Sequence, residues 1–280
     1  MTWTVHDETS CLLGEGPLWH PERGELFWFD ILGRTLHAKG RRQRLPDLAS
    51  AAGWVDRDTL LVAMGDALCR HVIGTDLFEP VATVDAHPLT RFNDGRADPQ
   101  GGFWISRMGR RTEAEAGGIW RFHRGEARPL FDRVTIPNAI CFDPDGRFAL
   151  FADTARRTVW SVALDEAGWP KGEPAVFLDL RAEGLDPDGA VMDRDGTLWV
   201  ALWGKGEVAG YRDGRRVGTH AVPAVQTTCP ALGGPDLSTL FVTSAAAGLP
   251  QADIAHAPEQ GRTFAVETAI RGVPEPRVIL

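Results

Sequence analysis

Four side chains that carry oxygen atoms stand at the same distance before four similar turns of this 280-residue chain. Counting five residues back from His20, Asp98, Asp143 and Asp193 leads to Glu15, Asn93, Asn138 and Asp188. Carboxylate and amide oxygens are hard ligands that suit calcium, magnesium or manganese and are acceptable to iron or zinc. Two carboxylates brought together without a cation would repel each other. The set therefore predicts a site for one divalent cation, provided that the fold brings the four positions together.

Turn chemistry offers an alternative explanation for each residue taken singly, because Asn and Asp often end strands in Asx-turns. The shared distance in four repeats favours a common site over four separate turns. The aspartates inside the turns need no further role, and the spacing of an EF-hand calcium loop is missing. Glu15 differs from an ordinary surface glutamate because Gly14 and Gly16 flank it, which frees the backbone to aim the carboxylate.

The elements that must position these residues are short strands joined by tight turns. An apolar segment, a turn of Asp, Pro and Gly, and an aromatic-rich segment recur in that order, which is a hairpin signal. Four copies are clear, and two weaker ones lie near 51–64 and 231–245. In these two copies the same count of five residues leads to Ala51 and Pro230, which carry no side-chain oxygen.

The spacing of the copies predicts the fold. Large apolar residues in the second segment of each copy are separated by 34, 43, 46, 49 and 42 residues; they are Phe27, Leu61, Trp104, Leu150, Trp199 and Phe241. This is the period of a propeller blade, a four-stranded sheet of about 40–50 residues. We expect an all-β protein, a six-bladed β-propeller that forms a single domain over residues 1–280. Segment 263–270 would close the ring by pairing near the N-terminus.

Such a fold would gather the four oxygen-bearing side chains, since equivalent positions of innermost strands face one another across the central channel. Composition excludes other classes of function. The net charge of −8 argues against a nucleic-acid partner. No apolar stretch is long enough for a membrane span and no secretory signal is visible, so a cytoplasmic location is expected. The motifs of serine hydrolases, zinc proteases and nucleotide-binding folds are absent.

Five segments in order carry a resemblance to a known family: LGEGPLWHPERG, RFNDGRADPQGG, IPNAICFDPDGR, PDGAVMDRDGTLWVALWG and GGPDLSTLFVTS. They resemble regucalcin, gluconolactonase and luciferin-regenerating enzyme from about residue 11 to the C-terminus. The last two are similar to bacterial sugar lactonases, including xylonolactonases and arabinolactonases. The resemblance implies a six-bladed propeller that binds one divalent ion (Ca, Zn, Mn, Mg or Fe(II)) and opens the ring of a small-molecule sugar lactone.

The resemblance also implies roles for individual residues. Glu15, Asn138 and Asp188 would bind the metal, and Asp188 would act as the general base. Arg91 and Asn93, from the R-x-N-D motif, would contact the lactone. Arg111 takes the place at which several animal members have an acidic residue that contacts substrate. Two alternatives stay open: a metal-dependent esterase or phosphotriesterase-like hydrolase, and a calcium-binding propeller without catalysis. The sequence indicates no oligomeric state.

Overall fold

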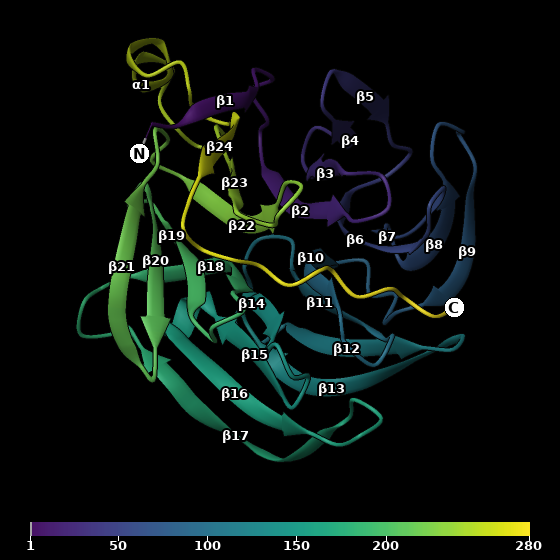
Figure 1. Ribbon diagram of the computed structural model, residues 1–280. Helices are drawn as coiled ribbons and strands as arrows, with labels where there is room; N and C mark the ends of the chain where they lie inside the picture. Colours follow the sequence, from purple (N-terminus) through teal and green to yellow (C-terminus); the bar gives the residue numbers. More distant parts are fainter. Residues whose placement is uncertain (1) are drawn as a thin grey trace.

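The computed structural model describes residues 2–280, except for the side chains of Gln251, Asp253 and His256. The strands form six antiparallel sheets of four strands each, arranged around a central channel (Figure 1). Each innermost strand contacts the innermost strands of the two neighbouring blades. The predicted six-bladed β-propeller is therefore confirmed. The second-segment apolar residues, from Phe27 to Phe241, all lie in the second strands of their blades.

The blades follow the chain in order, each from its innermost to its outermost strand. Blades 1 and 2 consist of β2 (Gly14–His20), β3 (Glu25–Asp30), β4 (Thr35–Ala38), β5 (Arg41–Arg44), β6 (Ala49–Asp56), β7 (Thr59–Met64), β8 (Ala67–Val72) and β9 (Phe78–Thr83). Blades 3 and 4 consist of β10 (Thr90–Ala97), β11 (Phe103–Gly109), β12 (Gly117–His123), β13 (Glu126–Val134), β14 (Pro137–Phe142), β15 (Phe148–Asp153), β16 (Thr158–Leu164) and β17 (Pro170–Asp179). Blade 5 consists of β18 (Asp186–Met192), β19 (Leu198–Trp203), β20 (Glu207–Arg212) and β21 (Arg215–Ala221).

Blade 6 joins the two ends of the chain. Its inner strands are β22 (Thr227–Gly233), β23 (Thr239–Ser244) and β24 (Thr263–Glu267), and its outermost strand is β1 (Thr4–Asp7). The pairs Thr4–Ala265 and Val5–Phe264 hold β1 against β24. The predicted closure of the ring near the N-terminus is thus confirmed. A short helix, α1 (Gln251–His256), lies in the connection between β23 and β24, and a 3-10 turn, η1 (Thr154–Arg156), follows β15.

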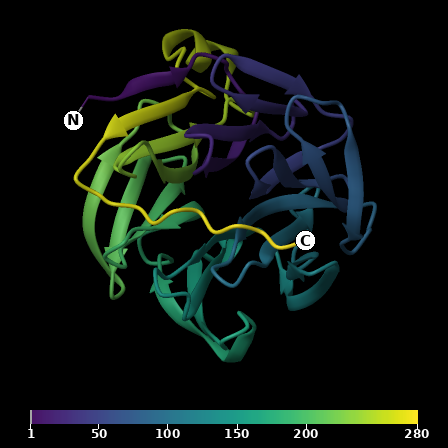
Figure 2. The same cartoon turned by 45° about the vertical axis from the view of Figure 1, so that its right-hand side comes forward.

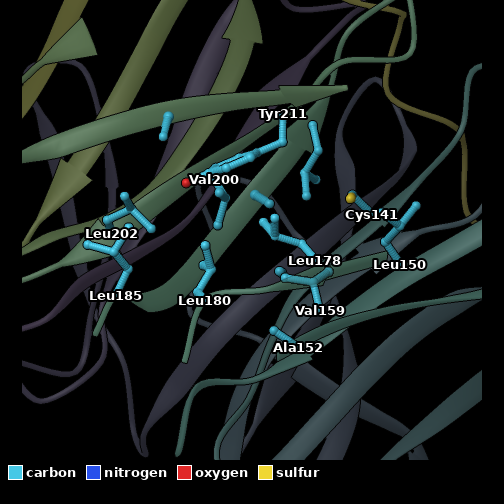
Figure 3. Packing of buried hydrophobic residues seen from close by; sticks show 14 of the residues in the cluster. Cys141, Leu150, Ala152, Val159, Leu178, Leu180, Leu185, Val200, Leu202 and Tyr211 are labelled. Carbon is cyan, nitrogen blue, oxygen red and sulfur yellow. The ribbon is translucent and has the colours of Figure 1, made fainter. Parts of the chain in front are cut away.

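Apolar side chains between neighbouring blades form the core. One cluster joins blades 4 and 5, where Val159 and Leu150 of one sheet pack with Val200 and Tyr211 of the next (Figure 3). Similar clusters join the other neighbours, so the blades support one another around the ring. Burial of apolar surface of this kind is the dominant stabilising term in folding. Among the residues that the structure describes, no helix is long and apolar enough to cross a membrane.

The C-terminal segment, residues 268–280, crosses one end of the central channel as an extended strap (Figure 2). Backbone hydrogen bonds tie it to several blades: Val278 N–H donates to Trp54 O at 2.9 Å, and Ile279 N–H donates to Gly101 O at 2.8 Å. Val278 is fully buried. The strap covers the end of the channel at which the turns 21–24, 98–102 and 193–197 lie. The innermost strands begin at the other end, which the strap does not cover and which is called the open end below.

A candidate metal centre in the central channel

In each blade, the pairing between the innermost strand and the second strand becomes irregular near the beginning of the innermost strand. The irregular stretches are Glu15–Leu18, Ala49–Ala51, Phe92–Gly95, Asn138–Cys141, Pro187–Ala190 and Thr227–Pro230. A bulge turns the side chains of the extra residues away from the regular alternation of the sheet. The four predicted oxygen-bearing residues all lie in these stretches, which is how the blades direct them toward the axis.

Strand pairing gives a common reference point in each blade. The second-strand residues Phe27, Leu61, Trp104, Leu150, Trp199 and Phe241 pair with Leu18, Gly53, Arg96, Cys141, Val191 and Ala231. Counting three residues back along each innermost strand from its paired residue leads, in blade order, to Glu15, Ser50, Asn93, Asn138, Asp188 and Thr228. All six blades therefore place an oxygen-bearing side chain at the equivalent position, two more than the sequence predicted.

The prediction of Ala51 and Pro230 at the equivalent positions was wrong, and the pairing explains both errors. Strand β6 has a second irregularity between Trp54 and Asp56, so a count from Asp56 stops one residue too late. In β22 the strand ends at Gly233, and a count from Pro235 stops two residues too late. The count of five residues holds only where the innermost strand has one bulge and its turn begins at the expected residue.

The backbone at Glu15 requires the glycine that follows it. Gly16 has φ +56°, and a Cβ atom built there would lie 2.1 Å from the Ser50 carbonyl oxygen. Asn138 is followed by Ala139 with φ +54°, the same left-handed conformation in a residue that rarely adopts it. Non-glycine residues in this region cost on the order of 1–3 kcal/mol, and such costs concentrate at functional sites.

A chain of hydrogen bonds links three blades. Arg91 Nη1 donates to Asn93 Oδ1 at 2.8 Å, and Asn93 Nδ2 donates to Asn138 Oδ1 at 2.9 Å. Asn138 Nδ2 donates to Thr154 Oγ1 at 2.8 Å, and that hydroxyl donates to Pro187 O at 2.6 Å. The chain fixes the rotamers of both amides and ends one residue before Asp188. In the structure Asn93 thus contacts both Arg91 and Asn138.

The carboxylates Glu15 and Asp188 share one desolvated region. Burial, reinforced by repulsion from Asp94, raises the pKa of Glu15 to about 8. Burial and the negative charges of Glu15 and Asp94 raise the pKa of Asp188 well above its usual range. Burial lowers the pKa of Arg91 to about 10, although Glu15 and Asp188 both favour its charged form. These four groups therefore interact electrostatically, and three of them are carboxylates against one guanidinium.

Two further residues of this site, Asp94 and Thr154, were not predicted from the sequence. Asp94 accepts hydrogen bonds from Ile140 N–H at 2.7 Å and Gly95 N–H at 2.8 Å, and burial raises its pKa to about 6. It ties β10 to β14 and adds a third negative charge. Thr154 joins the two neighbouring strands β14 and β18, as described above. Both residues stand in the recurring segments of the sequence, but their partners are distant in the chain.

The donor set fits a divalent cation. Glu15 and Asp188 destabilise each other in the absence of positive charge, which a cation between them would relieve. Asn138 Oδ1 accepts one hydrogen bond and retains a lone pair. Within the described part of the chain, no group of three or more His, Cys, Asp and Glu residues is arranged to hold a metal ion. A site here would therefore combine two carboxylates with amide oxygen, as the hard cations accept.

By its fold and site, the protein is a β-propeller with charged, oxygen-bearing side chains in its central channel. Comparisons with known proteins identify its family. The profile described as the SMP-30/Gluconolactonase/LRE-like region matches residues 13–246. The chain belongs to this family. The Haloferax volcanii pentonolactonase is 34% identical (98% of this chain, 97% of that protein), and the Azospirillum brasilense L-arabinolactonase is 33% identical (98% and 94%).

A solved structure supports the same assignment. The calcium-binding protein regucalcin from Agrobacterium tumefaciens is 40% identical to this chain and superposes with a TM-score of 0.96, covering 99% of this chain and 97% of the other. The luciferin-regenerating enzyme superposes with a TM-score of 0.90 at 21% identity and shows the shared fold. The family expected from the sequence motifs is therefore confirmed.

Proposed function

We propose that this protein is a sugar lactonase that hydrolyses an aldonolactone to the aldonic acid at the centre formed by Glu15, Asn138 and Asp188. The observation that carries the proposal is the pair of mutually repelling carboxylates close to Arg91, because a cation bound between them would relieve the repulsion. The relatives named pentonolactonase and L-arabinolactonase, at 33–34% identity over nearly the whole chain, support the same reaction class.

Glu15, Asn138 and Asp188 would hold the metal. A divalent cation bound there supplies Lewis acidity toward a carbonyl oxygen and makes a nearby water molecule more acidic. Asp188 lies on blade 5, across the ring from blade 2, and it would accept the proton of the attacking water as general base. The raised pKa of Asp188 reflects the same desolvation that strengthens electrostatic interactions in a dry site.

Arg91 and Asn93 would together orient the lactone. The two hydrogens of Arg91 Nη1 go to Phe92 O and Asn93 Oδ1, so Nε and Nη2 are left to donate to a carbonyl or ring hydroxyl. Both Asn93 amide hydrogens are used, toward Pro137 O and Asn138 Oδ1. Asn93 therefore positions Arg91 and Asn138, and can meet substrate only as an acceptor. Arg91 would offset the negative charge that develops on the substrate.

The test is lactone hydrolysis by purified protein, stripped of metal and then resupplied with single divalent ions. Proton release from xylono-, arabino- and gluconolactone is followed, and spontaneous hydrolysis is subtracted. We expect activity that requires an ion and is lost in Asp188→Ala. The control Asp195→Ala removes an exposed carboxylate from the turn of the same blade and should keep full activity. Ion binding without hydrolysis of any lactone would favour the calcium-binding alternative.

A further inference from the structure

Arg110 follows the β10–β11 hairpin at the open end of the channel. Arg91 pairs with Met108 and Thr90 pairs with Gly109. Arg110 N–H donates to Leu89 O at 2.8 Å, so the pairing extends by one more residue beyond the strand. The rim of the channel above Arg91 is therefore formed by a regular ladder rather than by a loose loop.

Register places Arg110 on the same face as Arg91. Alternate residues of a strand share a face, so Arg110 lies on the side of Met108, and directly paired residues share a face as well. The opposite face is occupied by Arg107, whose guanidinium stacks on Phe92 at 4.7 Å. Arg110 and Arg91 are thus diagonal neighbours, about 7–8 Å apart, within reach of two long side chains. Arg110 also contributes to the lowered pKa of Arg91, which is the expected effect of a nearby positive charge.

Arg110 has no carboxylate partner among the described residues, unlike three other arginines toward this end of the propeller. Arg107 pairs with Asp66, Arg133 with Glu115 and Arg157 with Asp186. The exposed Arg110 side chain makes a single hydrogen bond, from Nε to Pro88 O at 3.1 Å. Its two terminal nitrogens are left to donate, and a guanidinium fork of this kind matches carboxylate, sulfonate and phosphate groups.

The family resemblance assigns the position of the substrate contact to Arg111, whose surroundings differ from those of Arg110. Arg111 lies in the turn that follows the hairpin, where its backbone N–H donates to Glu113 Oε2 at 3.0 Å. The Glu113 carboxylate therefore stands beside Arg111 and offsets its charge. Among the described residues Arg110 forms no ion pair, and its side chain donates only to the Pro88 carbonyl oxygen, so no carboxylate neutralises it directly.

We propose that Arg110 binds an anionic group of the substrate, and that the protein prefers sugar lactones with a phosphate, sulfonate or carboxylate away from the lactone ring. The inference rests on the lactonase function proposed above. A divalent cation would balance Glu15 and Asp188, so that Arg91 faces the lactone and Arg110 adds a further positive charge along the ladder. A five- or six-carbon sugar with a charged terminal group can span the two arginines.

The test compares gluconolactone with its 6-phosphorylated and 6-sulfonated derivatives and with glucarolactone, using the full chain and the most activating divalent ion. We expect a lower KM for at least one anionic lactone, and the three anions identify the group. Arg110→Ala should raise KM for that lactone about tenfold, the loss of one charge-assisted interaction, with little change in kcat. The constants for gluconolactone should not change, and Arg110→Glu should have a larger effect.

Arg133→Ala is the matched control, because it removes one positive charge from the same end of the propeller on an outer strand. It should leave the KM for the anionic lactone unaltered. Efficient hydrolysis of neutral lactones without preference for any anion would overturn this inference alone. An equal rise in KM for neutral and anionic lactones in Arg110→Ala would do the same. Hydrolysis of none of the lactones would overturn the proposed function as well.

Discussion

The two ends of the central channel differ in whether their buried charges are paired. At the end covered by the C-terminal strap, Arg96 and Glu275 are both largely buried and form an ion pair of 2.5 Å. At the open end, Glu15 and Asp188 repel each other, and each favours the charged form of Arg91 without forming an ion pair with it. Charges paired within the protein hold the strap in place. An excess of buried negative charge costs free energy of folding, and titratable groups perturbed in this way cluster at functional sites.

The largest effect is expected from Asp188→Asn, which keeps the shape of the side chain and removes its charge. Lactone hydrolysis should fall about thousandfold through loss of the general base. The free energy of unfolding without metal should stay equal or rise, because the repulsion with Glu15 disappears. Steady-state kinetics and urea unfolding check both parts. Retained activity with lowered stability would mean that the open end has only a structural role.

Glu275→Gln tests the covered end. Removing one partner of a buried ion pair leaves an uncompensated charge on Arg96 and should lower the free energy of unfolding by about 3 kcal/mol. The kcat of the folded protein should change little. Replacing both partners, in Arg96→Met with Glu275→Leu, should recover most of the loss, as chemical denaturation would show. A large fall in kcat at unchanged stability would contradict the division of roles between the two ends.

Metal binding should stabilise the protein through the open end alone. At a free ion concentration of 100 Kd the expected gain is about 2.7 kcal/mol, measured as a shift of Tm by calorimetry. Glu275→Gln should show the same gain as the parent protein. The double variant Glu15→Gln with Asp188→Asn should show almost none, and an equal gain there would place the ion elsewhere.

A smaller effect is expected on changing pH. The folded-state pKa of Glu15, about 8, lies above its ordinary value, so the folded protein binds an extra proton between about pH 4.5 and 8. Without metal, the free energy of unfolding should therefore fall as pH rises from 6.5 to 8. The partly buried His6, with a pKa lowered from 6.5 to about 4, affects the free energy of unfolding between these two pH values, below the interval to be measured. Urea unfolding at several pH values checks the slope, which bound metal should abolish; a rising slope would contradict the shift.

The fold was predictable because turns and alternation are local signals. Asp-Gly turns and aromatic second strands recur at blade spacing, and each copy points to the same hairpin. Glu15, Asn93, Asn138 and Asp188 were reached by counting along single strands, and the structure places all four in register-breaking stretches. Counting failed at Ser50 and Thr228, since an additional bulge and a displaced turn change the number of residues without leaving a mark in the composition.

Sequence by itself determined the repeat, the ring of strands and the residue types that could bind a cation, because these depend on short-range backbone preferences. Tertiary structure decided which residues meet. The Asp94–Ile140 hydrogen bond, the chain from Arg91 to Thr154 and the pairing of Arg96 with Glu275 join residues 46, 63 and 179 positions apart. Such contacts arise from the closure of the ring, and burial in the channel sets the charge state of each carboxylate. A linear pattern of residues encodes neither of these.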